Sequence, residues 1–423
     1  MTPFMEKFNL NYSLKNIPTP SRDTYTLQLI DKVEAVIKRM RWKLYWYYES
    51  DNNYKDEQNK KETYGFRSKN TPPPQLELES FENDLFNMIA SIKFRNSTDD
   101  FQKKIQEDIR QINNSDKVLV FADKTTNIYK LSIDEHSKLL KNNVTKTYKK
   151  APPKLEKSIN LEAKYIASSY SIDNRAECLA NTPAFITLKD HKENFQTKLP
   201  CRLINPCKSN IGAVSKSILD RINSDIRGST NVNQWKNTNE VLNWFDSIGD
   251  KASCQFIQLD IKEFYPSISK ELLTNALEFA RQHTTISEKE TRTILHCRKS
   301  LLFFKDEAWI KKCTDDCFDV TMGSYDGAEI CELIGLLLLH NLSKIIAKKD
   351  AGLYRDDGLI VVCNMQGCTA EKLRQKIINI FKSFDLQIEI AIGLPSVDFL
   401  DVTLDLKSNS FRPYKNQMIL FFM

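Results

Sequence analysis

Two apolar segments joined by an acidic turn place the strongest constraint on what this chain can fold into. Residues 352–362 run from one apolar segment through Asp356, Asp357 and Gly358 into another, which predicts a tight β-hairpin. Adjacent carboxylates at such a turn repel each other, and burial increases the cost. A divalent cation relieves the repulsion, because magnesium prefers carboxylate oxygens. The same residues also fit an ordinary exposed hairpin turn, so the motif alone leaves both interpretations open.

A second acidic strand precedes this hairpin in the sequence. Residues 256–260 form an apolar run that ends in Asp260. If the two strands pair side by side, Asp260, Asp356 and Asp357 converge on one site. Such carboxylates can bind two Mg²⁺ ions about 3.5–4 Å apart, which hold the attacking and leaving oxygens of a phosphoryl transfer. We therefore expect these three residues to be catalytic and metal-binding, with Mn²⁺ as a possible substitute for Mg²⁺.

The N-terminal part of the chain has a helical pattern. Residues 25–48 predict a helix that ends in alternating basic and aromatic residues at 39–48. Such groups can stack on bases and neutralise phosphates. An amphipathic helix that docks on its own domain explains them too, and we favour this interpretation. A polar linker at 49–74 is followed by a second predicted helix. Its apolar face comprises Leu78, Phe81, Leu85, Met88, Ile89 and Ile92.

Hairpin signals mark the region after residue 117. Residues 118–121 and 128–131 are short strand-like runs around a polar turn. Residues 183–188 predict another strand, and residues 202–204 its return strand. A helix is expected over 211–226, where isoleucine and valine recur on one face. From residue 252 onward, strands and helices alternate as in an α+β domain with an antiparallel sheet.

Charge and cysteine usage narrow the class of protein. The chain has 61 Lys and Arg against 55 Asp and Glu, a net charge of +6, which permits nucleic-acid binding but also fits an ordinary solvated surface. The ten cysteines are scattered without a CxxC pair, so we expect reduced thiols and no zinc site. The N-terminus lacks a basic segment followed by an apolar core, and the apolar run 333–339 is too short to span a bilayer. We expect an intracellular protein of nucleus or cytoplasm, not secreted and without a membrane partner.

Taken together, these residues resemble a known family. The order and spacing of the motifs are similar to those of reverse transcriptases, and more narrowly to Penelope-like element reverse transcriptases, retroelement enzymes related to telomerase. The similarity covers roughly residues 62–415. The segments that carry it are residues 122–125, 186–192, 260–268, 323–329, 354–357 and 399–404.

The resemblance implies roles for individual residues. Asp260, Asp356 and Asp357 match the metal-binding carboxylates of the family. Tyr265 occupies the position of an aromatic steric gate, whose ring would collide with a ribose 2′-hydroxyl and so select deoxynucleotides; a purely structural role in the core is the alternative. The resemblance also assigns the triphosphate of the incoming nucleotide to basic residues of the fingers, which fits the affinity of basic side chains for phosphate oxygens. These residues are Lys189, Lys192 and Arg202.

Other positions match contacts to template and primer. Lys208 is a candidate template contact, and the loop containing Gly323 and Ser324 matches a segment that packs on the template and the nascent pair. Glycine there lets the backbone approach nucleic acid closely. Glu329 and Glu332 in the following helix are expected to be structural, pairing with fingers residues. The match to the family's primer grip comprises Phe399, Leu400 and Asp401.

The resemblance implies an α+β, right-hand polymerase fold with fingers, palm and an N-terminal helical extension. We expect the thumb to be absent or truncated, because family members continue beyond the equivalent of residue 423, many of them into an endonuclease. The expected divisions are 1–117 for the extension, 118–250 for the fingers side, 251–395 for the palm and 396–423 for the primer-grip hairpin with the truncated C-terminus.

The function implied is RNA-directed DNA synthesis by two-metal phosphoryl transfer from a deoxynucleoside triphosphate to a primer 3′-hydroxyl. The partners would be an RNA template, a DNA primer and the nucleotides; the sequence does not indicate the oligomeric state. Two alternatives remain. One is a catalytically inactive, nucleic-acid-binding remnant of a reverse transcriptase, and the other is a telomerase-like enzyme.

Overall fold

A computed structural model describes residues 22–52, 64, 66, 70–93, 100–175, 181–192, 194–312, 317–365 and 367–414. The chain divides into two compact units. The first comprises residues 1–63, 67–120 and 128–136, and the second comprises residues 64–66, 121–127 and 137–423. The predicted apolar tail at 418–423 lies outside the described residues, as does most of the predicted linker.

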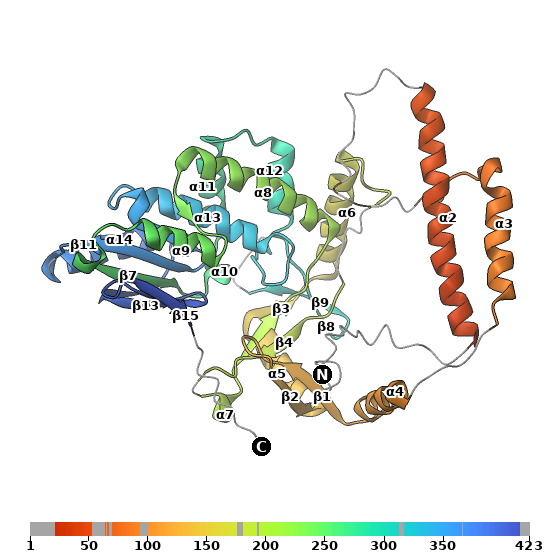
Figure 1. The fold of residues 1–423 in the computed structure, drawn as a ribbon, viewed down its shortest axis with the longest axis horizontal. Coiled ribbons are helices and arrows are strands. Elements are labelled where there is room, and N and C mark those ends of the chain that lie inside the picture. Colours follow the sequence, from red (N-terminus) through yellow and green to blue (C-terminus); the bar gives the residue numbers. More distant parts are fainter. Residues whose placement is uncertain are drawn as a thin grey trace. The chain divides into compact units, whose positions relative to one another are not determined.

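The first unit is mainly helical. Its elements are α2 (Arg22–Asn52), α3 (Leu76–Ser91), α4 (Asp100–Asn113) and the paired strands β1 (Lys117–Phe121) and β2 (Ile128–Ser132), which are coloured red to orange in Figure 1. Both predicted N-terminal helices and the hairpin are confirmed. Helix α2 is joined to α3 by Arg41, whose Nε donates to Glu82 Oε1 at 2.6 Å. At the end of α2, Trp46 and Tyr47 remain exposed.

The second unit is built around a five-stranded sheet in the order β12-β7-β11-β10-β6. Strand β7 is antiparallel to both of its neighbours, β11 is antiparallel to β10, and β6 is parallel to β10. These are the strands expected around Asp260 and the acidic turn. Their bounds are β6 (Asn233–Gln234), β7 (Cys254–Ile261), β10 (Ala351–Tyr354), β11 (Asp357–Cys363) and β12 (Ile388–Leu394).

Residues of β7 alternate between two hydrophobic layers, because successive side chains of a strand point to opposite faces. Ile257, Leu259 and Ile261 face a large core shared with α8 (Asn210–Thr230), α11 (Lys270–Arg281), α13 (Gly327–Leu342) and α14 (Gly367–Lys382). Phe256 faces a smaller core shared with α9 (Thr238–Ser247) and the sheet β13 (Ser396–Phe399), β14 (Val402–Asp405) and β15 (Ser410–Pro413). In Figure 1, β13 and β15 lie beside β7 and β11 of the central sheet, next to helix α9.

Helix α13 is buried on nearly all sides. Twelve of its sixteen residues are buried, including the whole run 333–339. A helix that is apolar all round belongs in the interior of a protein, so the expected buried helix is confirmed. Two ion pairs join it to α8, Lys216 with Glu329 and Arg227 with Glu332 at 2.7 Å. None of the helices in the described ranges is long and apolar enough to cross a bilayer.

Smaller elements complete the second unit. The pair β4 (Phe185–Leu188) and β5 (Cys201–Ile204) is the predicted strand and its return. The sheet β3 (Tyr148–Lys150), β9 (Glu307–Lys311) and β8 (Leu302–Phe304) was not predicted. The remaining helices are α5 (Ile133–Thr147), which begins in the first unit, α6 (Pro153–Ser169), α7 (Phe195–Lys198), α10 (Phe264–Ser267) and α12 (Glu288–His296); the short 3₁₀ turns are η2 (Lys251–Ser253) and η3 (Lys348–Asp350).

The expectation that all cysteines are reduced thiols is wrong for one pair. Cys254 begins β7 and Cys363 ends β11, and the register of the two strands places them directly opposite each other. Their sulfur atoms form a disulfide that joins positions 109 residues apart. No sequence signal marks this pairing, because it depends on a strand register and not on a local motif. The free cysteines among the described residues include Cys201, Cys207, Cys297, Cys331 and Cys368.

Candidate active site

The sheet brings the predicted carboxylates together at one end. Asp260, near the end of β7, lies directly opposite Asp357, the first residue of β11. Directly opposed residues of antiparallel strands share one face of the sheet, with Cβ atoms about 4.5–5.5 Å apart. Asp356 lies in the two-residue turn before β11, and its carbonyl oxygen accepts a hydrogen bond from the N–H of Ile261 at 2.9 Å. The turn is therefore held against the end of β7.

The electrostatics of this end of the sheet show that the carboxylates interact. Burial, followed by the charges of Asp356 and Asp260, raises the pKa of Asp357 from 3.8 to about 6. Burial, followed by Asp356 and Glu389, raises the pKa of Asp260. Each carboxylate thus resists ionisation of its neighbour. A bound cation would reverse this cost.

Glu389 is a fourth acidic residue at this site, and the sequence did not identify it. It lies on β12 directly opposite Asp260, on the side away from Asp357. Its carboxylate forms an ion pair with Lys262 at 2.9 Å. Glu389 lies in an ordinary alternating strand with no local motif, so only the register of β12 against β7 reveals it.

The donor set fits magnesium that is shared with a substrate. Among the residues that the structure describes, no group of three or more acidic, histidine or cysteine side chains converges closely enough to hold a metal ion alone. Mg²⁺ does not require such a cage, because it is usually bound by one or two carboxylates together with water and substrate phosphates. The hard oxygens of Asp260 and Asp357, placed opposite each other, match that requirement.

Tyr265 lies on the short helix α10, close to the acidic turn. Its ring is half-buried and packs against the large core. Burial, followed by the neighbouring Cys331, raises the pKa of its phenol, with smaller effects from Arg355 and Asp356, so the hydroxyl stays neutral near pH 7. The residue therefore belongs partly to the core and also lies near the carboxylates, as a gate would require.

The basic residues assigned to the nucleotide cluster around β4 and β5. Arg202 is paired with Thr187 in the register, and its Nη1 lies 3.1 Å from a carboxylate oxygen of Asp123. Lys189 follows β4 directly, and burial, followed by the positive charge of Arg202, lowers its pKa. Lys192 is exposed and acts electrostatically on Asp260. The structure thus groups all three, although the guanidinium of Arg202 is already engaged by an acid.

Lys124 is a basic residue of the same region for which the motifs predicted no individual role. It lies in the turn 122–127, where the N–H of Asp123 donates to the carbonyl oxygen of Leu188 at 2.8 Å. Its ammonium group is exposed, and its positive charge offsets part of the rise in the pKa of both Asp260 and Asp357. A lysine placed this way balances acidic groups or binds phosphate. The only sequence signal that could have identified Lys124 was the polar turn between the two short predicted strands.

The loop assigned to the template has a constrained backbone. Gly323 has φ +109°, and a Cβ there would lie 2.6 Å from the carbonyl oxygen of Asn205. The hydroxyl of Ser324 donates to the carbonyl oxygen of Thr321 at 3.2 Å. Lys208 Nζ lies 5.9 Å from the ring centroid of Tyr325. Glycine is therefore required at 323 by the protein's own backbone, before any nucleic acid binds.

The hairpin assigned to the primer lies on the carboxylate face of the sheet. Gln258, two residues before Asp260, donates from Nε2 to the carbonyl oxygen of Asp398 in β13 at 3.0 Å. Phe399 is only 2 % exposed and packs in the smaller core, so only its backbone is left for a primer contact. Leu400, with φ +53°, and the exposed Asp401 form the turn between β13 and β14. That turn is the accessible part of the predicted grip.

Comparison with solved structures identifies the fold. A telomerase of Candida albicans bound to a fragment of telomeric RNA matches 82 % of this chain with TM-score 0.52 and 12 % identity, and the chain spans 59 % of its length. An apo telomerase of Candida tropicalis matches 80 % with TM-score 0.52 and 10 % identity, over 67 % of its length. A form of the latter truncated from its C-terminal domain matches 95 % with TM-score 0.50 and 12 % identity, over 93 % of its length. No protein-family model and no curated protein matches the chain. The feature shared with these telomerases is a right-hand polymerase fold.

Proposed function

We propose that this chain is an RNA-directed DNA polymerase that transfers a nucleotidyl group from a deoxynucleoside triphosphate to the 3′-hydroxyl of a primer. The observation that supports this function best is the opposition of Asp260 and Asp357, with Asp356 in the adjoining turn, at one end of a sheet with the polymerase fold. Neighbouring carboxylates that raise each other's pKa are typical of catalytic sites, and a surface that only binds nucleic acid does not require them.

In this function the carboxylates would hold two magnesium ions together with the triphosphate. When bound, the ions would neutralise charge on the phosphates and lower the pKa of the primer 3′-hydroxyl. Lys124 and Lys192 act electrostatically on Asp260, so they also lie within range of a phosphate held beside that residue. Lys189 and Arg202 extend this basic group along β4 and β5. Catalysis is then positioning and charge stabilisation, without a covalent enzyme intermediate.

Tyr265 would select the sugar. A half-buried ring that packs on the core is fixed in place, and a fixed ring beside the carboxylates excludes a 2′-hydroxyl by collision. By excluding ribonucleotides, Tyr265 would restrict the enzyme to DNA synthesis.

We also attribute the chain to a Penelope-like retroelement. The support for this narrower proposal is the order of motifs along residues 122–404, which matches that group of reverse transcriptases. These motifs include both the basic residues around β4 and the acidic turn at Asp356 and Asp357. RNA template and DNA primer are the expected partners.

Primer extension tests the proposal. The full chain is incubated with an RNA template, an annealed DNA primer, deoxynucleotides and Mg²⁺. We expect extension of the primer that is abolished by EDTA and by Asp260→Asn. Extension of neither an RNA-templated nor a DNA-templated primer, by a protein that still binds the hybrid, would instead identify the inactive binding remnant.

A telomerase-like enzyme is the second candidate, because the matched folds are those of telomerases. Template choice separates the two. An enzyme of the telomerase kind would copy one co-purifying structured RNA, whereas a retroelement enzyme would copy any annealed RNA template added to it. Sequencing of RNA that purifies with the chain distinguishes these results.

A further inference from the structure

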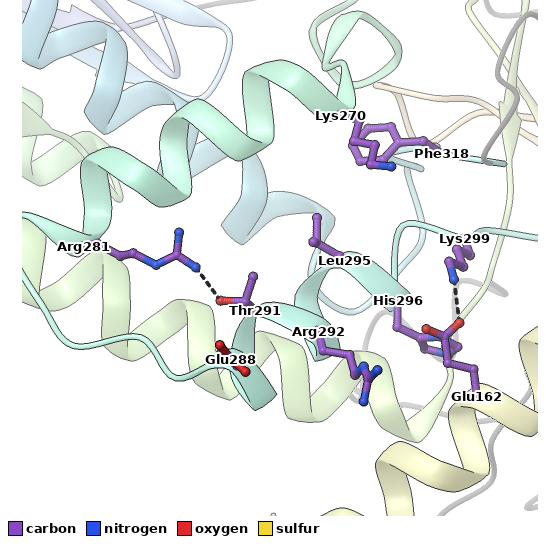
Figure 2. A pocket seen from close by; sticks show the side chains of 10 residues that line it. All are labelled: Glu162, Lys270, Arg281, Glu288, Thr291, Arg292, Leu295, His296, Lys299 and Phe318. Atoms are coloured by element: carbon purple, nitrogen blue, oxygen red, sulfur yellow. Dashed lines mark hydrogen bonds and ion pairs between the residues drawn. The ribbon is translucent and has the colours of Figure 1, made fainter.

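A cavity of about 410 Å³ opens between α6, α11 and α12, away from the proposed active site. None of the residues assigned to metal, nucleotide, template or primer lines it. Four cationic side chains and two acidic ones do, and Figure 2 shows them around the hollow. They are Lys270, Arg281, Arg292 and Lys299 with Glu162 and Glu288.

One of the two acids is already neutralised. The Glu162 carboxylate accepts a hydrogen bond from Lys299 Nζ at 2.6 Å and lies 3.1 Å from Nδ1 of His296. Figure 2 shows this pair at one end of the hollow. Among the other charged side chains of the lining, Arg281 and Arg292 outnumber the single acid Glu288, which favours an anionic ligand.

Two guanidinium groups in the cavity are available to bind that anion. Arg281 Nη2 donates to the hydroxyl of Thr291 at 2.9 Å, and the Arg292 guanidinium lies 5.3 Å from the ring centroid of Tyr165. Neither arginine forms an ion pair with an acidic residue in the described part of the chain. A guanidinium presents paired N–H donors that match two oxygens of one phosphate.

The distance between the cationic side chains at the two ends of α11 fits a nucleic-acid strand better than a single phosphate. Lys270 is the first residue of α11 and Arg281 the last, so they lie about 16 Å apart along the helix axis. A stacked nucleic-acid strand carries one phosphate about every 3.4 Å, so this distance covers roughly four or five phosphates. One inorganic phosphate or one free nucleotide could reach only one end.

An exposed ring stands beside the cavity. The side chain of Tyr165 on α6 is 62 % exposed, which is unusual for a large aromatic residue. Leu161, one helical turn earlier, is 68 % exposed. An exposed aromatic side chain next to basic groups is the combination that binds single-stranded nucleic acid, because bases stack on the ring while cations neutralise the backbone. Arg292 adjoins both the ring and the cavity, so one strand could use the two features together.

We propose that this surface is a second nucleic-acid site, which binds the phosphates of a single strand along α11 and α12 and stacks a base on Tyr165. The identification of that strand as the unpaired part of the RNA template rests on the proposed function; the binding chemistry does not. Lys270, Arg281 and Arg292 contact phosphate, and Tyr165 contacts a base.

Fluorescence anisotropy of a labelled, unstructured 12-nucleotide RNA tests this site in the full chain. In the double variant Arg281→Gln with Arg292→Gln, the Kd at about 0.1 M salt should increase about tenfold, and the slope of log K against log salt should fall by about 1.4. Tyr165→Leu keeps an apolar side chain and removes the ring, so it should weaken binding at least fivefold without changing the slope.

Matched controls separate this proposal from its rivals. Lys372→Gln with Lys376→Gln removes the same charge from exposed positions of α14 and should leave both Kd and slope unchanged. Asp260→Asn should abolish incorporation and leave RNA affinity intact, whereas the arginine variant should retain incorporation at saturating template. A failed polymerase assay with intact, arginine-dependent RNA binding would therefore overturn only the proposed function.

Three results would overturn the site. The first is an arginine variant that binds RNA with the Kd and slope of the unmodified chain. The second is displacement of the RNA by millimolar deoxynucleotide at constant ionic strength, which would identify a site for free nucleotides. The third is arginine-dependent binding of a poly-glutamate peptide with unchanged RNA binding, which would identify a protein-docking site.

Discussion

Asp260 and Asp357 face each other across neighbouring strands, and Glu389 occupies the matching position on the other side of Asp260. Three acids therefore lie in one row across β12, β7 and β11. The pair next to the turn is the one that burial and mutual repulsion keep from ionising easily. This row allows the proposed catalytic acids, Asp260 and Asp357, to be distinguished experimentally from Glu389.

Removing one charge from the pair should stop catalysis without unfolding the protein. We expect Asp260→Asn or Asp357→Asn to lower the rate of nucleotide incorporation about 10³-fold, because the phosphoryl transfer loses charge stabilisation. Glu389→Gln is the matched control and should retain activity within a few-fold. Single-turnover primer extension measures all three. Equal losses of activity in the three variants would show that catalysis depends on the total negative charge at this end of the sheet and not on the Asp260–Asp357 pair.

Stability should depend on pH through Asp357. Its pKa is about 6 in the folded chain and 3.8 in the unfolded chain, so the folded state binds more protons between these values. Stability without divalent cations should therefore fall as pH rises from about 4 to about 6. Asp357→Asn should raise stability at pH 7.5 by on the order of 2 kcal/mol and have little effect at pH 4. Urea unfolding at the two pH values in EDTA measures this, and a variant that is less stable at pH 7.5 would contradict it.

Tyr265 should determine the choice of sugar. Replacing it by alanine opens the space next to the 2′ position, so we expect incorporation of ribonucleotides to increase about 100-fold relative to deoxynucleotides, a change of about 2.7 kcal/mol in discrimination. Tyr265→Phe keeps the ring and removes only the hydroxyl, so its selectivity should be unchanged. The ratio of kcat/KM for the two nucleotides is the measurement. Loss of selectivity in the phenylalanine variant would point to the hydroxyl and not to a steric gate.

Gly323 should not tolerate a side chain. Its φ is +109°, and an added methyl carbon would lie 2.6 Å from the carbonyl oxygen of Asn205, so Gly323→Ala should cost about 2–3 kcal/mol of folding free energy. Gly228 in α8 has open space around its Cβ position, so Gly228→Ala should be neutral or stabilise by up to about 1 kcal/mol. Thermal unfolding of both variants tests this. Equal effects would mean that the loop can rearrange.

The buried pair of Arg298 and Asp326 should be the most sensitive ion pair in the second unit. Each side chain is 1 % exposed, and the Asp326 carboxylate also accepts a hydrogen bond from Ser215 at 2.6 Å. Arg298→Met leaves a buried charge without its partner and should cost about 3–5 kcal/mol. Adding Asp326→Asn should restore much of that loss.

The exposed pair of Lys150 and Glu307 is the control for this prediction. The two side chains are 63 % and 49 % exposed, so Lys150→Met should cost less than about 1 kcal/mol. Chemical denaturation of the single and double variants gives the coupling energy. Additive effects of the Arg298 and Asp326 substitutions would show that the two groups do not interact strongly.

Local patterns predicted the elements that have one clear periodicity. The acidic hairpin, the strand ending in Asp260, and helices α8 and α13 follow directly from runs of apolar residues. Helix α5 was not predicted, although its start carries a signal. Ser132 and Glu135 form reciprocal hydrogen bonds, in which the N–H of Glu135 donates to the Ser132 hydroxyl at 3.2 Å and the N–H of Ser132 donates to the Glu135 carboxylate at 3.0 Å. This capping box is visible in the sequence.

What could not be predicted depends on register between distant strands. The position of Glu389 beside Asp260 and the bond between Cys254 and Cys363 both follow from how β7 aligns with its two neighbours. A shift of one residue would move each side chain to the other face. The electrostatic effect of Lys124 on the carboxylates also depends on contacts between distant segments, because its turn is held by the hydrogen bond from Asp123 N–H to the carbonyl oxygen of Leu188.

The strand β6 limits how the sheet could be excised as a separate recombinant fragment. This strand comes from residues 233–234, before β7 begins, and pairs with the outer side of β10. Trp235 follows it and covers Gly352 so closely that a Cβ there would collide with the indole ring. A fragment starting at β7 would lose this cover and expose a bare sheet edge, which invites aggregation. A soluble minimal fragment would therefore need to begin upstream of residue 233.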